Sequence, residues 1–162
     1  RTVMTQMVMP NDTNPLGNLM GGNLMRWMDI AGGICAAKHS EAHVVTASVD
    51  NVSFSQPIHL GDVVTIEATV TRSFRTSMEI YLEIFAEDIK GGNARMTNSA
   101  YMTFVAMDED KKKPIPVPKV IPLTTEQQKR YDAALRRRQL RLILAGRLKP
   151  DDATELKSLF FD

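Results

Sequence analysis

The stretch Asn11–Ala36, NDTNPLGNLMGGNLMRWMDIAGGICA, carries most of the information about the fold and the chemistry of this chain. Its first half is dense in Pro, Asn, Asp and Gly, which is typical of turns. Gly21-Gly22 then leads into a helical pattern that runs to about Lys38. At 100° per residue, the predicted helix places five residues on one apolar stripe: Leu24, Trp27, Met28, Ala31 and Cys35.

Asp29 falls on the opposite side of this predicted helix, where its neighbours include Gly22, Gly33 and Ala36. A lone carboxylate among apolar and very small residues needs a reason, because burying an uncompensated charge is costly. Each glycine costs a helix roughly 0.8–1 kcal/mol against alanine, so this side indicates close approach of a strand, a second chain or a ligand. The alternative is a surface helix in which Asp29 pairs with Arg26.

The composition is that of an ordinary globular protein, with 162 residues, 43% apolar and 24% charged. A net charge of +1 argues against nucleic acid as the main partner. The single cysteine, Cys35, excludes an internal disulfide and favours a reducing compartment, so we expect a cytoplasmic protein with a buried, inert thiol. No apolar run approaches the roughly 20 residues that cross a bilayer. The sequence does not begin with Met, so a targeting segment could have been removed.

An antiparallel sheet is predicted from segments with alternating apolar residues and short connecting turns. The expected strands are Thr2–Met9, Val44–Phe54, Val63–Ser73, Thr76–Glu87 and Ala94–Ala106. Each of the four later strands has one apolar face that is expected to be buried. The residues on these faces are, for Val44–Phe54, Val45, Ala47, Val49 and Val52; for Val63–Ser73, Val64, Ile66, Ala68 and Val70; for Thr76–Glu87, Met78, Ile80, Leu82 and Ile84; and for Ala94–Ala106, Met96, Ala100, Met102 and Phe104. One long helix before them indicates an α+β domain, with the helix packed on one face of the sheet.

The character of the chain changes after Asp108. Residues 109–123 form a Pro-rich strap, and residues 124–162 read as a helical extension. Its first helix is expected from Thr124 to Ala145, and a short helix from Asp151 to Phe160 follows. The basic run RRRQLR at 136–141 could attract phosphates, although a solvated helix face is the commoner meaning of such a run.

Several common chemistries have no motif in this sequence. There is no Walker loop, Rossmann fingerprint or G-x-S-x-G elbow, and the three histidines lack a metal-binding context. What remains is a helix start at Gly21-Gly22 with Asp29 about two turns further on. Free N–H groups at a helix start can hold an oxyanion, and a nearby acid can activate water or attack a carbonyl. A simple helix cap is the other interpretation of Gly21-Gly22.

The series PNDTNPLGNLMGG…WMD…AGG, VVTASVD…F…P…GDVV, TSMEI and AYMTFVA resembles the hotdog-fold acyl-CoA thioesterases of the brain acyl-CoA hydrolase type. The resemblance runs from about Met9 to Pro122, and the tail also looks like that subfamily. It implies a hotdog domain over residues 1–108, in which a sheet wraps around the central helix. It also implies edge-to-edge dimers assembled into a hexamer, and hydrolysis of fatty acyl-CoA to free acid and CoA. No metal and no cofactor are implied.

The resemblance assigns roles to particular residues. The catalytic aspartate of the family falls on Asp29, and its loop asparagine falls on Asn14. The glycine whose N–H polarises the thioester carbonyl falls on Gly21 or Gly22. Relatives often have His before the double glycine, whereas this chain has Met20, which puts a side-chain role at that position in doubt.

Two further implications concern substrate and assembly. The corner Arg75, Thr76 and Ser77 resembles a place where relatives contact the pantetheine arm of CoA. In two-domain relatives the asparagine and the aspartate come from different repeats. This chain holds Asn14 and Asp29 in one repeat, so a dimer would build two complete sites.

Two other functions compete with hydrolysis. A non-catalytic acyl-CoA sensor on the same fold would have little reason to keep both Asn14 and Asp29. A dehydratase or hydratase of the hotdog superfamily usually pairs a histidine with an acid, and no histidine lies in the predicted helix before Asp29.

Overall fold

The computed structural model describes residues 1–161, in two compact units, one from Arg1 to Lys119 and one that begins at Val120. The first unit contains β1 (Thr2–Met7), the 3₁₀ turn η1 (Pro10–Asp12), α1 (Gly21–Ser40), β2 (His43–Asp50), β3 (Val63–Ser73), β4 (Ser77–Glu87) and β5 (Arg95–Met107). The second unit contains α2 (Thr125–Leu144), the 3₁₀ turn η2 (Pro150–Asp152) and α3 (Thr154–Phe161).

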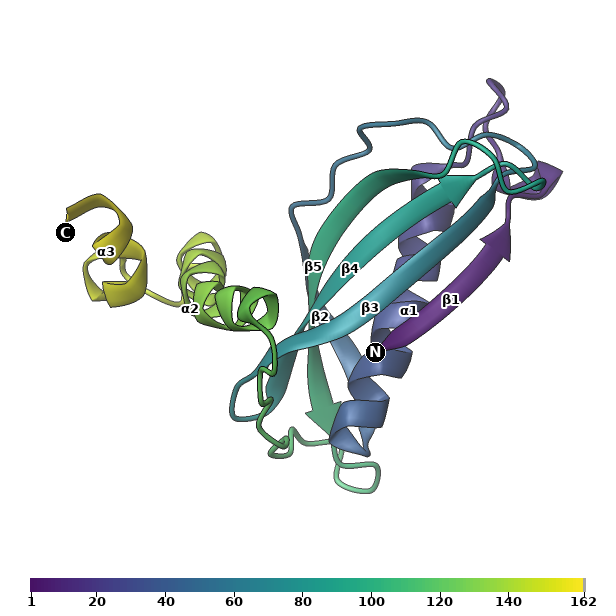
Figure 1. The fold of residues 1–162 in the computed structure, drawn as a ribbon. Coiled ribbons are helices and arrows are strands. Elements are labelled where there is room, and N and C mark those ends of the chain that lie inside the picture. Colours follow the sequence, from purple (N-terminus) through teal and green to yellow (C-terminus); the bar gives the residue numbers. More distant parts are fainter. Residues whose placement is uncertain (162) are drawn as a thin grey trace. The chain divides into compact units, whose positions relative to one another are not determined.

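The strands form one antiparallel sheet in the order β1-β3-β4-β5-β2 (Figure 1). Alternation along β4 places four apolar side chains on the face toward α1, all fully buried: Met78, Ile80, Leu82 and Ile84. These are the residues expected to be buried in this strand, and Val64, Ile66 and Ala68 of β3 are fully buried as well. Val70 of β3 is only half-buried, since the pairing with β4 shifts between Val70 and Arg72 and the next residue, Thr71, is buried instead. The other expected positions of these two strands confirm the predicted core.

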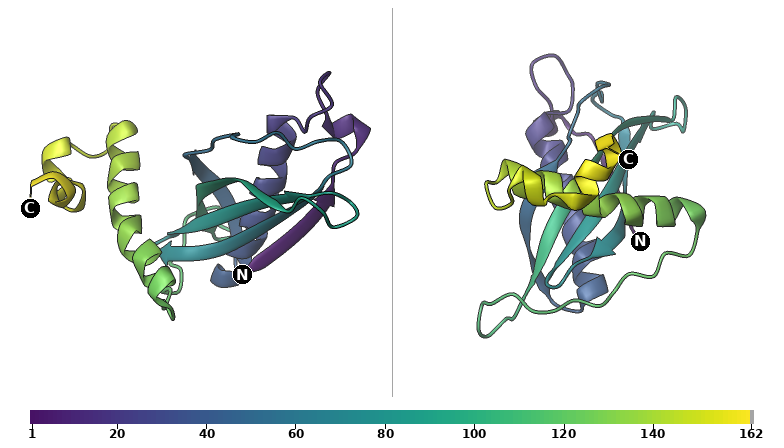
Figure 2. Two further views of the ribbon diagram at one scale, coloured as in Figure 1. Left: turned by 45° about the horizontal axis from the view of Figure 1, so that its top comes forward. Right: turned by 90° about the vertical axis from the view of Figure 1, so that its left-hand side faces the viewer.

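Helix α1 lies along one face of the sheet (Figures 1 and 2). Its predicted apolar stripe, from Leu24 to Cys35, is buried against the strands, chiefly against β3. Gly32 allows the helix to approach closely, because a methyl group there would lie 2.9 Å from Cε2 of Phe104. A single long helix packed on a long antiparallel sheet confirms the expected α+β architecture.

The edge strand β2 differs from its prediction. It ends at Asp50 rather than Phe54, since Asn51 takes the left-handed conformation with φ of 55°. The pairing with β5 shifts between Thr46 and Ser48, so Ala47 forms a bulge. The expected burial of Val45 and Ala47 is wrong: both are exposed, Val45 by 50%. Before the bulge it is Val44 and Thr46 that share the face toward α1.

A second irregularity changes the start of β5. The pairing with β4 shifts between Ile84 and Phe85, which are opposite Asn98 and Met96. Thr97 is therefore the extra residue, and it is buried, whereas Met96 is 43% exposed. The expected burial of Met96 is wrong because a bulge reverses the alternation of side chains along a strand.

The second unit is helical, as the extension was expected to be. Thr124 caps α2 by accepting a hydrogen bond on Oγ1 from the Gln127 N–H at 3.1 Å. The chain turns after α2 at Gly146, whose φ is 72°. The N–H of Leu156 donates to Oε1 of Gln139 at 3.0 Å, which joins α3 to α2. Over the described residues, no helix is long and apolar enough to span a membrane.

Candidate active site

Asp29 and Thr46 meet between α1 and the edge strand β2. The Thr46 hydroxyl donates a hydrogen bond of 2.5 Å to Oδ1 of Asp29. Thr46 reaches the helix because it is aligned with Phe104 of β5, whose side chain also faces α1. Within residues 1–161 no ion pair joins Asp29 to Arg26, so the alternative of a surface pair is not observed. Asp29 is exposed in the single chain and available to a ligand.

Thr46 is the site residue that sequence reasoning missed. It lies within the segment VVTASVD, but simple alternation placed Val45 and Ala47 on the buried face and hence Thr46 on the other. Only the pairing of β2 with β5, with its bulge at Ala47, turns the Thr46 side chain toward the helix. The sequence offered one indication of its role: Thr46 is a polar, β-branched residue in the strand directly after the helix that carries Asp29.

Asn14 is held by its own loop. Its Oδ1 accepts the N–H groups of Leu16 at 3.0 Å and Asn18 at 3.1 Å, and backbone hydrogen bonds to Asn18 and Gly17 close the turn. These hydrogen bonds fix the side chain. In the part of the chain that the structure describes, its amide nitrogen Nδ2 donates to no acceptor. The structure does not bring Asn14 into hydrogen-bonding contact with Asp29 of the same chain.

The start of α1 leaves two N–H groups available. Met20 is the N-cap residue and gives no side-chain cap, while its carbonyl accepts from the N–H groups of Asn23 and Leu24, both at 3.1 Å. Among the described residues, no acceptor is found for the N–H groups of Gly21 and Gly22. Such groups, at the positive end of the helix dipole, stabilise negative charge. The helix start therefore presents two free N–H donors, about two turns from Asp29.

The corner Arg75, Thr76 and Ser77 connects β3 to β4. Its backbone is engaged, since the carbonyl of Thr76 accepts from Ala106 at 3.0 Å and that of Arg75 accepts from Val117 at 3.1 Å. Ser77 is aligned with Val105, next to the row that contains Thr46. Because this alignment is one residue away from that of Thr46 with Phe104, the corner lies at the same end of the sheet as the Asp29–Thr46 pair. Two strand spacings, roughly 10 Å, separate the corner from β2.

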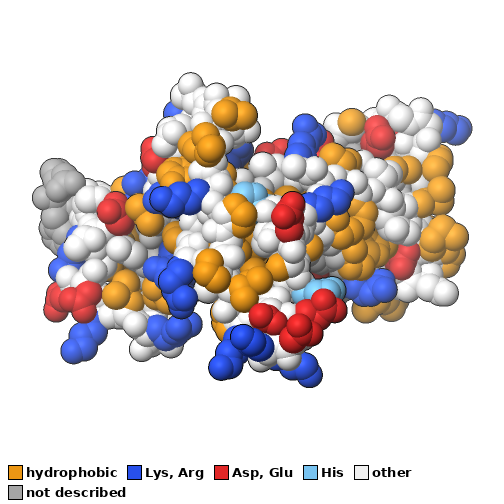
Figure 3. Space-filling model, turned by 90° about the horizontal axis from the view of Figure 1, so that it is seen from below, with side chains coloured by type: hydrophobic (Ala, Val, Ile, Leu, Met, Phe, Trp, Pro, Cys, Tyr) orange, Lys and Arg blue, Asp and Glu red, His pale blue; other side chains and the backbone are white. Residues whose placement is uncertain are grey.

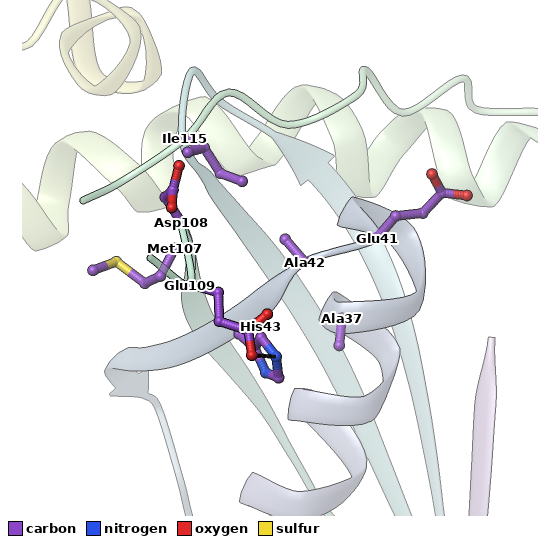
Figure 4. A pocket seen from close by; sticks show the side chains of 8 residues that line it. All are labelled: Ala37, Glu41, Ala42, His43, Met107, Asp108, Glu109 and Ile115. Carbon is purple, nitrogen blue, oxygen red and sulfur yellow. Dashed lines mark ion pairs between the residues drawn. The ribbon is translucent and has the colours of Figure 1, made fainter. Parts of the chain in front are cut away.

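A hollow of about 580 Å³ lies at the other end of α1 (Figure 4). Its lining is Ala37, Glu41, Ala42, His43, Met107, Asp108, Glu109 and Ile115. Nε2 of His43 and Oε1 of Glu109 are 3.3 Å apart. Viewed from this end, acidic side chains and a histidine gather beside Lys and Arg (Figure 3). Ala37 follows Asp29 by two helical turns, roughly 12 Å, and neither Asp29 nor Thr46 lines this hollow.

The remaining titratable candidates have structural contacts. Nε2 of His39 lies 2.9 Å from the Pro118 carbonyl oxygen, and Nδ1 of His59 lies 2.9 Å from Oδ1 of Asn18. Residues 1–161 contain no group of three or more His, Cys, Asp or Glu that could hold a metal ion. Cys35 is buried as expected and donates to the Ala68 carbonyl at 3.4 Å, and burial raises the pKa of its thiol. A protonated, buried thiol is a poor nucleophile.

The chain matches known proteins over most of its length. Residues 16–92 match the model of the thioesterase superfamily. The Bacillus subtilis protein YkhA, named an uncharacterized acyl-CoA thioester hydrolase, is 38% identical over 85% of this chain and 79% of its own length. An apo-hexameric acyl-CoA thioesterase superposes with a TM-score of 0.84 at 38% identity, covering 89% of this chain and 92% of the other.

A third similar protein is the acyl-CoA hydrolase of Staphylococcus aureus, whose structure contains butyryl coenzyme A, coenzyme A and coenzyme A disulfide. It superposes with a TM-score of 0.80 at 37% identity and covers 89% of each chain. The expected fold and family are thus confirmed by independent sequence and structural comparisons. The chain belongs to the thioesterase superfamily, with the hotdog fold of its acyl-CoA thioesterases.

Proposed function

We propose that this protein hydrolyses a fatty acyl-CoA thioester to the free acid and CoA, with Asp29 as general base or nucleophile. The observation that carries the proposal is the hydrogen bond of 2.5 Å between Thr46 and Asp29, in a member of this family. One carboxylate oxygen is held by the threonine, and the other is left to face water or the thioester carbonyl.

The chemistry needs three functions at one place. Asp29 takes a proton from water as it attacks the carbonyl carbon, or attacks that carbon itself. Two helical turns, roughly 12 Å, separate the start of α1 from Asp29 of the same chain, so we pair Asp29 with the helix start of the partner subunit. The N–H groups of Gly21 and Gly22 at that helix start stabilise the negative charge that develops on the carbonyl oxygen. The carbon–sulfur bond then breaks, and CoA leaves as a thiolate that takes up a proton. If Asp29 has attacked the carbon itself, water then hydrolyses the resulting mixed anhydride, which releases the free acid and restores the Asp29 carboxylate. Amide nitrogen Nδ2 of Asn14 serves as a further donor to the water or the carbonyl.

A comparison of spacings supports these assignments. The Staphylococcus aureus acyl-CoA hydrolase has been studied as alanine variants of one Asn, one Asp and one Thr, which are separated by 15 and 17 residues. Asn14, Asp29 and Thr46 have the same two separations in this chain. An identical spacing of three residue types in a relative 36% identical favours one shared site.

The proposed assembly is a hexamer built from dimers, as in the hexameric thioesterases to which this chain is similar. In each dimer Asn14 of one subunit completes the site that contains the partner's Asp29. The proposal includes binding of the CoA moiety near Arg75, Thr76 and Ser77. It also includes a cytoplasmic setting, which suits a protein with a single free cysteine.

The test is release of free thiol from palmitoyl-CoA by the wild-type protein and by Asp29→Asn. The substitution removes the charge and keeps the shape, so we expect turnover to fall by at least about 10²–10⁴-fold while folding and acyl-CoA binding persist. Since Cys35 is buried, the protein adds little background to a thiol assay. Binding of palmitoyl-CoA without turnover by wild type would identify a sensor. Near-normal turnover by folded Asp29→Asn would remove Asp29 from the mechanism.

A further inference from the structure

An aromatic side chain covers the start of α1. Phe54 belongs to the connection between β2 and β3, and it is 53% exposed. Its ring atoms Cζ, Cε1 and Cε2 lie 3.3, 3.5 and 3.6 Å from where a methyl group at Gly21 would be. The distal edge of the ring thus lies against the first turn of the helix, while about half of the residue is exposed. Single exposed apolar residues are common, so what matters is its place beside the free N–H groups.

The connection that carries Phe54 is fixed on both sides of it. The hydroxyl of Ser55 donates to the Thr97 carbonyl at 2.6 Å, and half-buried Val52 packs against the core. Further along, Nη2 of Arg95 donates to the Pro57 carbonyl and pairs with Oδ2 of Asp62, each at 3.0 Å. These contacts hold the connection to the body of the domain. The position of the ring over Gly21 is therefore set by the fold.

The two glycines at the helix start have different surroundings. A methyl group at Gly21 would be tighter against the ring than an ordinary van der Waals contact, whereas one at Gly22 would meet nothing within 4 Å. The absence of a side chain at position 21 thus makes room for Phe54.

We propose that Phe54 is a substrate-contacting residue that forms one wall of the thioester site. The exposed part of its ring packs on the acyl carbons next to the carbonyl and keeps water from the N–H groups of Gly21 and Gly22. Hydrogen bonds to a developing oxyanion are stronger where water is excluded, so the ring raises the rate of the chemical step. This inference rests on the proposed hydrolase function.

If Phe54 lies next to the carbonyl, its substitution should change kcat in a specific way. Phe54→Ala should lower kcat by about 10-fold or more, which is less than the about 10²–10³-fold typical of losing an oxyanion donor. The loss should be equal for butyryl-CoA and palmitoyl-CoA, because every acyl chain has the same first carbons. Phe54→Leu keeps an apolar cover and should restore most of kcat. Ile89→Ala, which truncates a side chain 58% exposed in the β4–β5 turn, is the matched control and should leave kcat unchanged.

A double-mutant cycle tests the contact with Gly21 directly. Gly21→Ala should lower kcat in the wild-type background, since its methyl group displaces the ring, and should have a much smaller effect in Phe54→Ala, where the ring is absent. Gly22→Ala is the control, because a methyl group there would not meet the ring. Its fold-change in kcat should be the same in the wild-type and Phe54→Ala backgrounds.

The outcomes separate the two proposals. If wild type releases no thiol, the hydrolase proposal fails. If wild type is active and Phe54→Ala has normal kcat, or Gly21→Ala and Phe54→Ala act independently, Phe54 is not a wall of the site. A loss that increases with acyl length, or that Phe54→Leu does not restore although circular dichroism shows it folded, also overturns the inference.

Discussion

The chemistry proposed at the level of residues depends on how Asp29 is oriented. A carboxylate on an exposed helix face can rotate freely, and Thr46 removes that freedom by occupying Oδ1. Among the described residues, nothing hydrogen-bonds Oδ2, so that oxygen is free to accept a proton or to attack a carbonyl. The threonine acts through the aspartate, which makes it a positioning residue.

Thr46→Ala is expected to lower kcat by about 10- to 100-fold, because a hydrogen bond to a charged group contributes about 1.5–3 kcal/mol and each 1.36 kcal/mol is tenfold in rate. Thr46→Ser retains the hydroxyl and should retain most of the activity. Thr5→Ala, at an exposed position of β1, controls for loss of a strand threonine and should be silent. Thiol release measured against substrate concentration gives kcat and KM separately. Equal kcat for Thr46→Ala and wild type would contradict the positioning role.

The predictability of these residues differs for physical reasons. Asp29 is a candidate from sequence because helical periodicity assigns a face to each residue, and one carboxylate then lies among apolar and small neighbours. Asn14 is a candidate by family resemblance alone, since its loop has no helical or strand periodicity. Thr46 could not be found by alternation, because one bulge reverses the faces of an edge strand.

Elements were predictable where burial on one face is strict. The central strand β4 and the stripe of α1 are both as expected, since a one-residue error would move every apolar side chain into water. The errors fall at Val45 and Ala47 of the edge strand β2 and at Met96 near the start of β5. Both places contain a bulge, and a bulge depends on the pairing with a neighbouring strand rather than on local sequence.

Because α1 packs closely on the sheet, alanine at Gly32 and alanine at Gly33 should affect the stability of the protein differently. A methyl group at position 32 would lie 2.9 Å from Phe104, whereas one at position 33 would lie at an ordinary 3.7 Å. Gly32→Ala should therefore destabilise the protein by about 1–3 kcal/mol through overpacking. Gly33→Ala should be neutral or gain up to about 1 kcal/mol from helix propensity. Urea unfolding followed by circular dichroism measures both, and equal midpoints would show that Phe104 does not limit the approach.

Considered as a whole, the single chain leaves its candidate site open. Apolar side chains near Asp29 are exposed: Met25 by 38%, Ile30 by 39% and Ile34 by 40% on α1, and Val45 by 50% on β2. β2 is also an edge strand, with unpaired backbone groups along one side. An apolar surface beside a free strand edge is suited to a second copy of the chain.

We therefore expect a dimer-based hexamer in solution, which light scattering coupled to size-exclusion chromatography would detect. Val45→Lys places a charge on the exposed edge of β2 and should lower the assembly state, because buried unpaired charges are costly. Val3→Lys makes the same change on β1, the opposite edge strand, where Val3 is 54% exposed, and provides the matched control. A stable wild-type monomer at micromolar concentration would contradict the proposed assembly.

The division of the active site between subunits is the sharpest consequence of this assembly. Asn14 is fixed in its loop yet has no hydrogen bond to Asp29 of its own chain in the part that the structure describes, so we expect it to serve the partner's Asp29. Asn14→Ala and Asp29→Ala should each be inactive alone. In a mixed dimer one site then contains both substitutions and the other contains neither, because a two-fold interface exchanges the roles of the two chains.

Random reassembly of equal amounts of the two variants should restore roughly a quarter of the wild-type sites by this symmetry. The experiment is to unfold the two proteins together, refold them, and measure thiol release from palmitoyl-CoA. Each variant refolded alone is the control for residual activity, and differently tagged subunits recovered together establish that exchange took place. If Asn14 and Asp29 act within one subunit, every site in every mixture carries one substitution. Proven exchange without recovery of activity would therefore assign both residues to the same chain.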